Sequence, residues 1–221
     1  MSARLPWSLI HTVLLDMDGT LLDLRFDNYF WRELVPARYA ERHDLPLARA
    51  HAEVTARTQA VEGTLSWYCL DYWSRELALD IVTLKREITH LIAVHPHALE
   101  FLDAVRAAGK RVALVTNAHP HSLALKMERT CLAGHFDAII CAHELGLVKE
   151  QPEFWPRLRE REPFAPAATL LVDDNSAILR AAQAYGVGYP VWVARPDSAH
   201  PPRPPGEFPA IHDFSELLPV E

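Results

Sequence analysis

Five short apolar runs, rich in β-branched residues, are spread along the chain at wide intervals. Segments of helical period separate most of them, which is typical of a parallel sheet built from βαβ units. The runs are Thr12 to Leu15, Arg111 to Val115, Ala138 to Cys141, Thr169 to Val172 and Pro190 to Ala194. The pattern predicts an α/β core with a Rossmann-like, doubly wound parallel sheet.

Two connecting segments have the spacing of helices that cover a sheet. From His97 to Ala108 apolar residues recur at i, i+3, i+4 and i+7, and Gly109 follows as a stop. The segment from Ser176 to Tyr185 has a similar apolar face and ends at Gly186. We therefore predict a helix in each segment.

The long interval between the first two runs contains helix signals and no convincing strand. These signals are the plausible N-caps Asp27, Asp44 and Asp80, Pro46 at a first helical position, and Gly63 as a stop. We expect an all-helical cap domain at residues 24–94, inserted into an α/β core of residues 1–23 and 95–221. The proline-rich stretch Arg195 to Pro209 is expected to be a loop or an extended arm.

Composition narrows the class of protein. A chain of 221 residues with 49% hydrophobic and 23% charged residues is ordinary for a globular protein. The net charge of −7 and the scattered Lys and Arg residues argue against binding to nucleic acid or to a membrane surface. We expect a small-molecule partner, and a monomer or a small homo-oligomer.

Cysteine usage and the first residues indicate a compartment. The three cysteines are irregularly placed and form no CxxC pair, so neither a disulfide framework nor zinc is indicated. Residues 1–13 lack the apolar core of a signal peptide, and no apolar run approaches the ~20 residues that span a bilayer. We expect a protein of the reducing cytoplasm.

Polar residues follow three of the runs. Asp16 and Asp18 come after the first run, and their spacing alone also fits a solvated turn at Gly19. Thr116-Asn117 and Asp173-Asp174 end two other runs, and Lys149 lies in the loop after the third. Ligands bind outside the carboxyl ends of strands in an open parallel sheet, so these groups should meet in one site.

The chemistry of that site follows from its residue types. Four clustered carboxylates repel one another without a cation, and hard oxygen ligands suit Mg²⁺. Thr116 and Asn117 offer a hydroxyl and backbone N–H groups to a bound substrate, the helix that opens near Pro120 directs its positive end there, and Lys149 adds a charge. Together they indicate a site for phosphoryl chemistry.

Four stretches resemble the ordered motifs of the haloacid dehalogenase (HAD) superfamily of phosphatases. They are DMDGT at Asp16 to Thr20, VTNA at Val115 to Ala118, GLVKEQPEF at Gly146 to Phe154 and LVDDNS at Leu171 to Ser176. The resemblance extends over essentially the whole chain, and the helical insert resembles the cap of one subclass. Glu150 departs from the pattern, because a proline is commoner there.

The resemblance implies a role for each matching residue. Asp16 would be the nucleophile that becomes an aspartyl phosphate, and Asp18 would be the general acid and base. Thr116 would hydrogen-bond the phosphoryl oxygens, and Lys149 would neutralise charge. The catalytic residues implied are therefore Asp16, Asp18, Thr116 and Lys149.

The same resemblance implies a Mg²⁺ site. Its ligands would be the Asp16 side chain, the backbone carbonyl of Asp18 and Asp174. Asp173 would be either a ligand or bound through a metal-bound water, and the sequence does not separate the last two residues.

Longer stretches resemble the bacterial purine (GMP/IMP) 5′-nucleotidases of this superfamily. They are LLDMDGTLLDL, FDNYFW, LSWYCLDYWS, TNAHPHSLALK and the KE variant of the third motif. A purine 5′-nucleotide is the substrate that this implies. A small sugar phosphate or another phosphometabolite remains an alternative, as does a non-catalytic sensor of a nucleotide or a partner.

Aromatic residues and histidines leave alternatives open. Trp67, Leu70, Trp73 and Leu77 are expected in the cap core, with Tyr68, Asp71, Tyr72 and Arg75 on a partly exposed face. Alternatively, one or two of Phe26, Tyr29, Trp67 and Tyr72 stack on a purine, with Asp71 or Asn28 bonded to it. The HPH tripeptides at His95–His97 and His119–His121 are expected in loops rather than at a metal, with a substrate contact as the alternative for His119 and His121. Cys69 is expected in the core.

Overall fold

The computed structural model describes residues 5–220. Within them, six parallel strands form one sheet in the order β3-β2-β1-β4-β5-β6. The strands are β1 (Thr12–Leu15), β2 (Arg111–Thr116), β3 (Ala138–Cys141), β4 (Thr169–Asp173), β5 (Tyr189–Val193) and β6 (Ala210–Ile211). The predicted parallel sheet is confirmed. The two-residue strand β6 was not predicted, because so short a run carries no pattern.

Both faces of this sheet are covered, which explains why its strands are continuous apolar runs. In β1, Val13 and Leu15 belong to one buried cluster, whereas Leu14 belongs to another on the opposite face. This alternation is the period of two that a strand imposes on its side chains. Each face of the sheet therefore has its own hydrophobic core.

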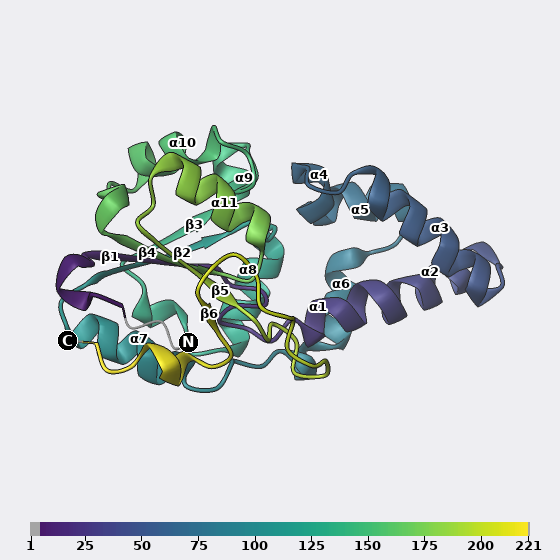
Figure 1. Ribbon diagram of the computed structural model, residues 1–221. Coiled ribbons are helices and arrows are strands. Elements are labelled where there is room, and N and C mark those ends of the chain that lie inside the picture. The colour runs from purple at the N-terminus through teal and green to yellow at the C-terminus, as the bar shows by residue number, and fades with distance from the viewer. Residues whose placement is uncertain (1–4, 221) are drawn as a thin grey trace.

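Helices and short turns cover the two faces. Figure 1 shows α7 on one side of the sheet and α10 and α11 on the other. The core elements are η1 (Trp7–Leu9), α7 (Ala98–Ala107), α8 (Pro120–Arg129), η4 (Ala133–His135), α9 (Ala142–Leu145), α10 (Phe154–Arg161), η5 (Pro166–Ala168), α11 (Ser176–Tyr185) and η6 (Phe214–Leu217). Both predicted sheet-covering helices are confirmed as α7 and α11.

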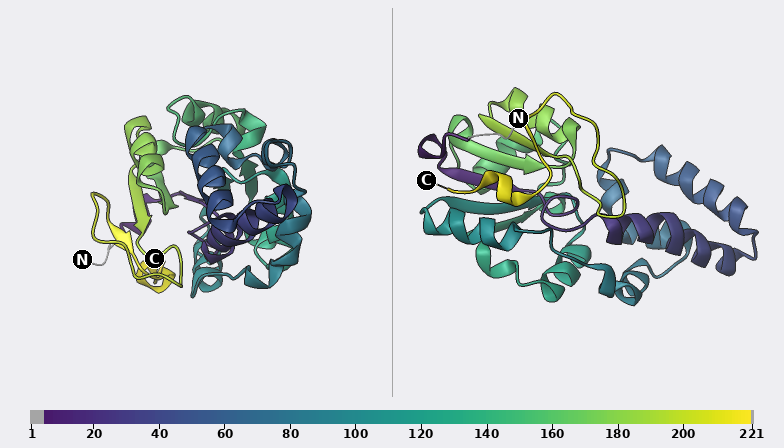
Figure 2. Two further views of the ribbon diagram at one scale, coloured as in Figure 1. Left: turned by 90° about the vertical axis from the view of Figure 1, so that its right-hand side faces the viewer. Right: turned by 60° about the horizontal axis from the view of Figure 1, so that its bottom comes forward.

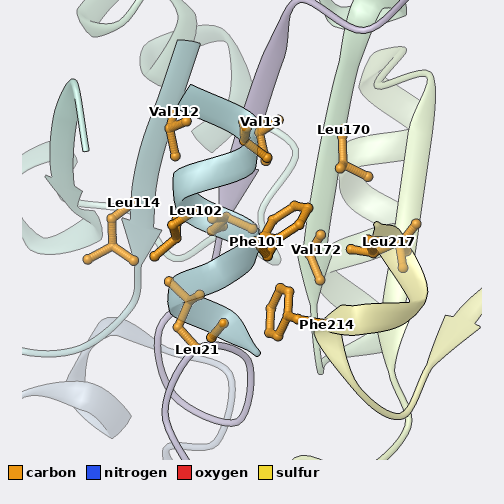
Figure 3. Packing of buried hydrophobic residues seen from close by; sticks show 14 of the residues in the cluster. Val13, Leu21, Phe101, Leu102, Val112, Leu114, Leu170, Val172, Phe214 and Leu217 are labelled. Carbon is orange, nitrogen blue, oxygen red and sulfur yellow. The ribbon is translucent and has the colours of Figure 1, made fainter. Parts of the chain in front are cut away.

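Packing on the α7 side is drawn in Figure 3. Phe101 and Leu102 of α7 lie over the sheet, close to Val13, and Phe214 and Leu217 of η6 complete the layer. All five side chains are at most 2% exposed. Burial of such side chains contributes about 1.5 to 3 kcal/mol each, and it fixes the strand ends on which the site is built.

The segment between β1 and β2 contains helices and no regular strand. It comprises α1 (Arg25–Tyr29), the π-helical turn η2 (Phe30–Leu34), α2 (Val35–His43), α3 (Leu47–Ala60), α4 (Leu65–Tyr68), α5 (Leu70–Leu77), α6 (Ile81–Glu87) and η3 (Thr89–Leu91). It stands beside the sheet in Figures 1 and 2. Phe30, Trp73 and Leu77 are buried in a cluster of this segment. A cap domain bounded at residues 24 and 94 remains our proposal.

The helix signals of this segment were only partly right. Asp80 is an N-cap and accepts a hydrogen bond from the Thr83 N–H at 3.0 Å. Asp44 instead follows the end of α2 with a left-handed φ of 52°, and Asp27 lies inside α1. Aspartate suits an N-cap and also tolerates the left-handed region, so its identity alone does not separate the two ends of a helix.

Two other signals were displaced by a few residues. Pro46 is the residue before the first helical position of α3, not the first helical residue. Gly63 has a φ of 73° and follows the end of α3 at Ala60 by three residues. A rigid proline φ suits both the N-cap and the first turn, so the start of the helix was off by one residue.

The stretch 195–209 has no helix or strand, as predicted. It reaches the start of the helical segment, where the Leu24 N–H donates to the Pro196 carbonyl at 2.8 Å. The Asn28 side chain also donates to Asp197 Oδ2 at 2.6 Å. Within residues 5–220, no helix is both long enough and apolar enough to cross a membrane.

Candidate active site

The carboxyl ends of β1 and β4 bring three aspartates together. Oxygen atoms of Asp16, Asp173 and Asp174 lie within 4.8 Å of one another. The two strands pair in parallel, with Leu15 beside Val172, so their next residues are neighbours at the same edge. The alternative of a solvated turn is wrong for Asp16, which is only 6% exposed.

Gly19 makes this close approach of the two strand ends sterically feasible. Its φ of 82° lies in the left-handed region, where glycine is favoured. A Cβ atom at this position would stand 2.8 Å from the carboxyl carbon of Asp174. A larger residue would therefore push Asp174 away from Asp16.

Lys149 supplies the positive charge inside the cluster. Its Nζ donates to Asp16 Oδ1 at 2.5 Å, to Asp173 Oδ2 at 2.8 Å and to the Val115 carbonyl at 3.0 Å. Burial lowers the pKa of Lys149, but Asp16 and Asp173 raise it by more, so the side chain stays an ammonium. The contacts with Asp173 and Val115 hold the ammonium in place, and its hydrogen bond to Asp16 Oδ1 orients that carboxylate and leaves Asp16 Oδ2 without this contact.

The two adjacent aspartates of the fourth motif have different surroundings. Both oxygens of Asp173 accept hydrogen bonds, one from Lys149 and one from the Asn175 N–H at 2.8 Å. Asp174 instead pairs through Oδ2 with Arg203 at 3.1 Å. These contacts favour Asp174 as a direct metal ligand, with Asp173 orienting Lys149.

The protonation of the cluster favours a divalent cation. Burial raises the pKa of Asp16 to about 7 and that of Asp173 to about 6. Burial and the charge of Asp16 raise the pKa of Asp174 to about 7. Hard carboxylate oxygens so close together fit Mg²⁺, whose charge would offset their repulsion.

The loop after β2 supplies groups for a phosphate. The buried Thr116 Oγ accepts a hydrogen bond from the Ala118 N–H at 3.0 Å, which leaves its own proton free to be donated. Helix α8 opens at Pro120, as predicted, and Asn117 lies between it and the strand. The side chain of Asn117 is occupied, because its Oδ1 accepts from the Lys149 N–H at 3.0 Å. Asn117 therefore shapes the loop of Lys149.

Glu150 connects three parts of the site. It accepts hydrogen bonds from Asn117 Nδ2 at 2.9 Å and from Asn175 Nδ2 at 3.2 Å. The Tyr68 hydroxyl of α4 donates to Glu150 Oε1 at 2.9 Å. The residue that stands in place of the commoner proline thus ties the helical segment to the core.

Asp18 faces a second buried lysine. Lys126 Nζ of α8 donates to Asp18 Oδ1 and to Asp27 Oδ2, each at 2.6 Å. Lys85 Nζ of α6 donates to Asp27 Oδ1 at 2.7 Å. Burial raises the pKa of Asp18 although Lys126 opposes the shift. The contact with Lys126 occupies Asp18 Oδ1 and leaves Asp18 Oδ2 without this hydrogen bond.

Two cavities meet at this site. One, of about 460 Å³, is lined by residues of all four motifs, among them Asp16, Thr116 and Lys149. The other, of about 570 Å³, is lined mainly by the helical segment. They share Asp18 and Tyr68 among their lining residues. A phosphate in the first cavity can therefore carry a larger group into the second.

The aromatic expectations have mixed outcomes. Trp73 and Leu77 are in the core of the helical segment, whereas Trp67 is half-buried and lines the larger cavity. Phe26 is 1% exposed and lies beneath the Lys85 ammonium at 4.8 Å, so it is not available for stacking. Tyr68 is partly exposed, as expected, and its hydroxyl also donates to Glu150.

The histidine and cysteine expectations were also partly wrong. His95 and His97 precede α7 in a loop, as predicted. His119 is the N-cap of α8 and only 7% exposed, and His121 is inside that helix. Cys69 is half-buried at the N-cap of α5 rather than in the core, because its Sγ accepts from the Tyr72 N–H.

Sequence reasoning missed Lys126, Arg203 and the contact of Tyr68. Lys126 carries a weak signal, since it follows Ser122 and Leu125 on the buried stripe of α8. A lysine on a buried helix face needs a carboxylate partner. Arg203 comes from the proline-rich stretch, where the sequence gives no indication of a contact with Asp174.

Comparisons with known proteins agree with this geometry. The family of haloacid dehalogenase-like hydrolases matches residues 10–186. Over 219 residues the chain is 40% identical to the GMP/IMP nucleotidase YrfG of Escherichia coli (strain K12). This match covers 99% of each of the two chains. A phosphoserine phosphatase of Thermus thermophilus is 32% identical over 103 residues, or 46% of this chain and 41% of that protein.

Solved structures share the fold. A HAD phosphatase from Thermococcus onnurineus has a TM-score of 0.77 at 21% identity, covering 94% of this chain and 96% of that chain. A putative β-phosphoglucomutase from Thermotoga maritima has a TM-score of 0.66 at 18% identity, covering 94% and 97%. These similarities confirm the predicted fold class.

The raised carboxyl pKa values predict how stability depends on pH and Mg²⁺. From the ordinary value of 3.8 up to about 7, folded Asp16 and Asp174 hold more protons than the unfolded chain does. In EDTA, their contribution to stability should therefore fall as pH rises through this range. Mg²⁺ at 100 times its Kd should raise Tm by about 5 to 10 °C at pH 8, and by less at pH 5.5.

Calorimetric melts at both pH values check this. Asp174→Asn is the matched variant, and it should lose most of the Mg²⁺-dependent rise in Tm. An equal rise at both pH values, or an undiminished rise in the variant, would contradict the assignment of the metal to this cluster.

Proposed function

The chain belongs to the haloacid dehalogenase-like hydrolases and is a phosphatase of that family, and we propose that it releases phosphate from purine 5′-nucleotides, GMP and IMP, with the help of Mg²⁺. The observation that carries this proposal is the bridge that Lys149 makes between Asp16 and Asp173 beside Asp174. It orients one carboxylate as a nucleophile next to a set of metal ligands. The GMP/IMP nucleotidase of Escherichia coli supports the substrate class.

The chemistry takes two steps. Asp16 Oδ2 attacks phosphorus and forms an aspartyl phosphate, while the bond to the nucleoside oxygen breaks and Asp18 protonates that oxygen. Asp18 then takes a proton from water, whose oxygen attacks phosphorus and releases inorganic phosphate and Asp16. Mg²⁺, held by Asp16, Asp174 and the backbone carbonyl of Asp18, would offset the charge of the phosphate.

The remaining groups position the phosphate. The Thr116 hydroxyl and the N-terminal N–H groups of α8 are donors for phosphoryl oxygens. Lys149 Nζ donates three hydrogen bonds within the protein. A bound phosphoryl oxygen therefore replaces one of these contacts, and that exchange keeps the charge of the cluster balanced.

The larger cavity suits the purine. Its lining residues include Asp18, the aromatic residues Trp31 and Trp67, and polar residues such as Gln59 and Glu62. Aromatic faces can stack on a purine, and a carboxylate can accept from the N1–H that guanine and hypoxanthine share but adenine lacks. This chemistry supports GMP and IMP over AMP.

Lys126 is a positioning residue for Asp18 in this proposal. Burial lowers the pKa of Lys126, but Asp18 and Asp27 raise it by more, so its charge persists. The ammonium holds Asp18 Oδ1 and leaves Oδ2 to carry the proton. It also opposes the upward shift of the Asp18 pKa, which keeps the base form available for the second step.

The compartment remains part of the proposal. The structure has three free cysteines, Cys69, Cys131 and Cys141, and no disulfide within residues 5–220. Free thiols are consistent with the reducing cytoplasm, where nucleotides are abundant.

Asp16→Asn should abolish turnover, because an amide is a far weaker nucleophile than a carboxylate. We expect kcat for p-nitrophenyl phosphate to fall by at least about 10⁴-fold, with far-UV circular dichroism unchanged. Glu160→Gln, an exposed change on α10, is the control. Near-normal turnover by Asp16→Asn would exclude the covalent mechanism.

The substrate proposal predicts an order of kcat/KM. GMP and IMP should exceed AMP, the pyrimidine nucleotides and sugar phosphates by about tenfold or more, since a missing hydrogen-bond partner in a buried site is costly. Steady-state phosphate release with each compound measures this. Indifference to the base, or a preference for sugar phosphates, would contradict the nucleotidase proposal while leaving the phosphatase intact.

Lys126→Met should change the pH dependence as well as the rate. Without the ammonium of Lys126, burial raises the pKa of Asp18 against the charge of Lys85 alone, so the acidic limb of the kcat–pH profile should move to higher pH. We expect kcat at pH 7 to fall by about 10- to 100-fold. Lys126→Arg, which keeps the charge, should retain the limb. A lower kcat with an unmoved limb would indicate a purely structural role.

A further inference from the structure

Three soft metal-binding side chains lie together outside the carboxylate cluster. The Sγ atom of Cys69 and one ring nitrogen each of His119 and His143 are within 4.8 Å of one another. Cys69 stands at the start of α5 in the helical segment, whereas His119 begins α8 and His143 lies in α9 of the core. The group therefore spans the junction between the two parts of the protein.

His143 is the residue that most needs a partner. Both of its ring nitrogens are buried, and neither has a hydrogen-bond partner among residues 5–220. Buried polar atoms are nearly always paired, because leaving one unpaired costs its lost hydration. Its nearest aromatic neighbour is His119, whose ring meets it edge-on with centroids 5.1 Å apart. A ring nitrogen that is buried, unpaired and beside two other donor side chains has the surroundings of a ligand.

The other two side chains keep an atom available. Cys69 Sγ accepts a hydrogen bond from the Tyr72 N–H at 3.4 Å, which a metal-bound sulfur can retain. His119 Nδ1 accepts from the His121 N–H at 3.3 Å, and its Nε2 lies 3.7 Å from Asp71 Oδ2. The exposed Asp71 is thus close enough to add an oxygen ligand at the rim.

We propose that Cys69, His119 and His143 form a second metal site that takes a soft divalent ion of the Zn²⁺ class, with Asp71 or water as the fourth ligand. One sulfur and two imidazole nitrogens suit tetrahedral Zn²⁺ and disfavour Mg²⁺, which prefers oxygen. The site is separate from the aspartate cluster in both its residues and its chemistry. The proposal does not rest on the proposed substrate.

Binding follows a balanced proton exchange. The Cys69 thiol loses its proton to solvent, and its thiolate binds the ion. Both imidazoles bind as neutral rings, and burial already lowers the pKa of His143 to about 4 and lowers that of His119. Ligation through His119 Nε2 leaves the proton on Nδ1, so the long contact with the His121 N–H is the one hydrogen bond that has to break.

Occupation of this site has a mechanical consequence. Metal–ligand bonds from Cys69 on one side and from the two histidines on the other would hold α5 against the core. They act beside the existing contact of Tyr68 with Glu150. The ion would therefore stabilise the arrangement in which the two cavities join.

Metal titrations of the full-length protein test the proposal. Metal-free protein in excess Mg²⁺, which occupies the carboxylate cluster, is titrated with Zn²⁺ by calorimetry and with Co²⁺ by absorption. We expect one Zn²⁺ per chain and a thiolate-to-cobalt charge-transfer band with visible bands of tetrahedral geometry. Cys69→Ser and His143→Asn should each weaken Zn²⁺ binding by at least about 100-fold. Cys69→Ser should also remove the thiolate-to-cobalt band, and His143→Asn should alter the visible bands of bound Co²⁺.

Two controls keep the test specific. Cys131→Ser, which removes an exposed thiol elsewhere, and Asp174→Asn, which removes an oxygen ligand of the other site, should both retain Zn²⁺ binding. Circular dichroism and Tm establish whether each variant is folded. If His143→Asn does not fold, His143→Gln replaces it in the test. Unchanged binding in Cys69→Ser and in the folded His143 variant would overturn the proposal. So would signals of the His143 ring that respond to GMP and not to Zn²⁺.

Discussion

The buried ammonium of Lys149 is the interaction on which the site depends. Asp16 directly follows β1 and Asp173 ends β4, and these two strands pair side by side. The sheet therefore brings two carboxylates together in one buried site. Their repulsion is tolerable because one Nζ donates to both, at 2.5 and 2.8 Å. Removing either partner leaves an uncompensated buried charge. The residues that set the geometry of the site are therefore also the ones at which a substitution destabilises the fold.

A second run of alternating charges extends from Asp18 into the helical segment. Lys126 joins Asp18 to Asp27, and Lys85 continues the run from Asp27. Asp18 and Lys126 belong to the core, whereas Asp27 and Lys85 belong to the helices between β1 and β2. The proposed acid and base is therefore held by a network that requires both parts of the protein, which couples its orientation to the placement of the helical segment.

The sequence predicted what local pattern and strand order determine. The five apolar runs became strands, and Asp16, Thr116, Lys149 and Asp174 meet because parallel strands share one carboxyl edge. Contacts that depend on tertiary packing were not predictable in this way. Nothing in the sequence near Arg203 indicates that it pairs with Asp174. His143 of α9 likewise carries no sequence signal, because its neighbours come from α5 and α8. Aspartates 27 and 44 show the same limit, because one residue type serves several local conformations.

Glu150 shows how a departure from a family pattern can carry information. A proline at this position would fix the loop by its own rigidity, and it could accept no side-chain hydrogen bond. Glutamate instead accepts from Asn117, Asn175 and Tyr68, so the loop of Lys149 is fixed by contacts. One of these contacts comes from α4, so it requires the helical segment to lie beside the core. The shape of the Lys149 loop therefore depends on the position of the helical segment. A proline at residue 150 would not create this dependence.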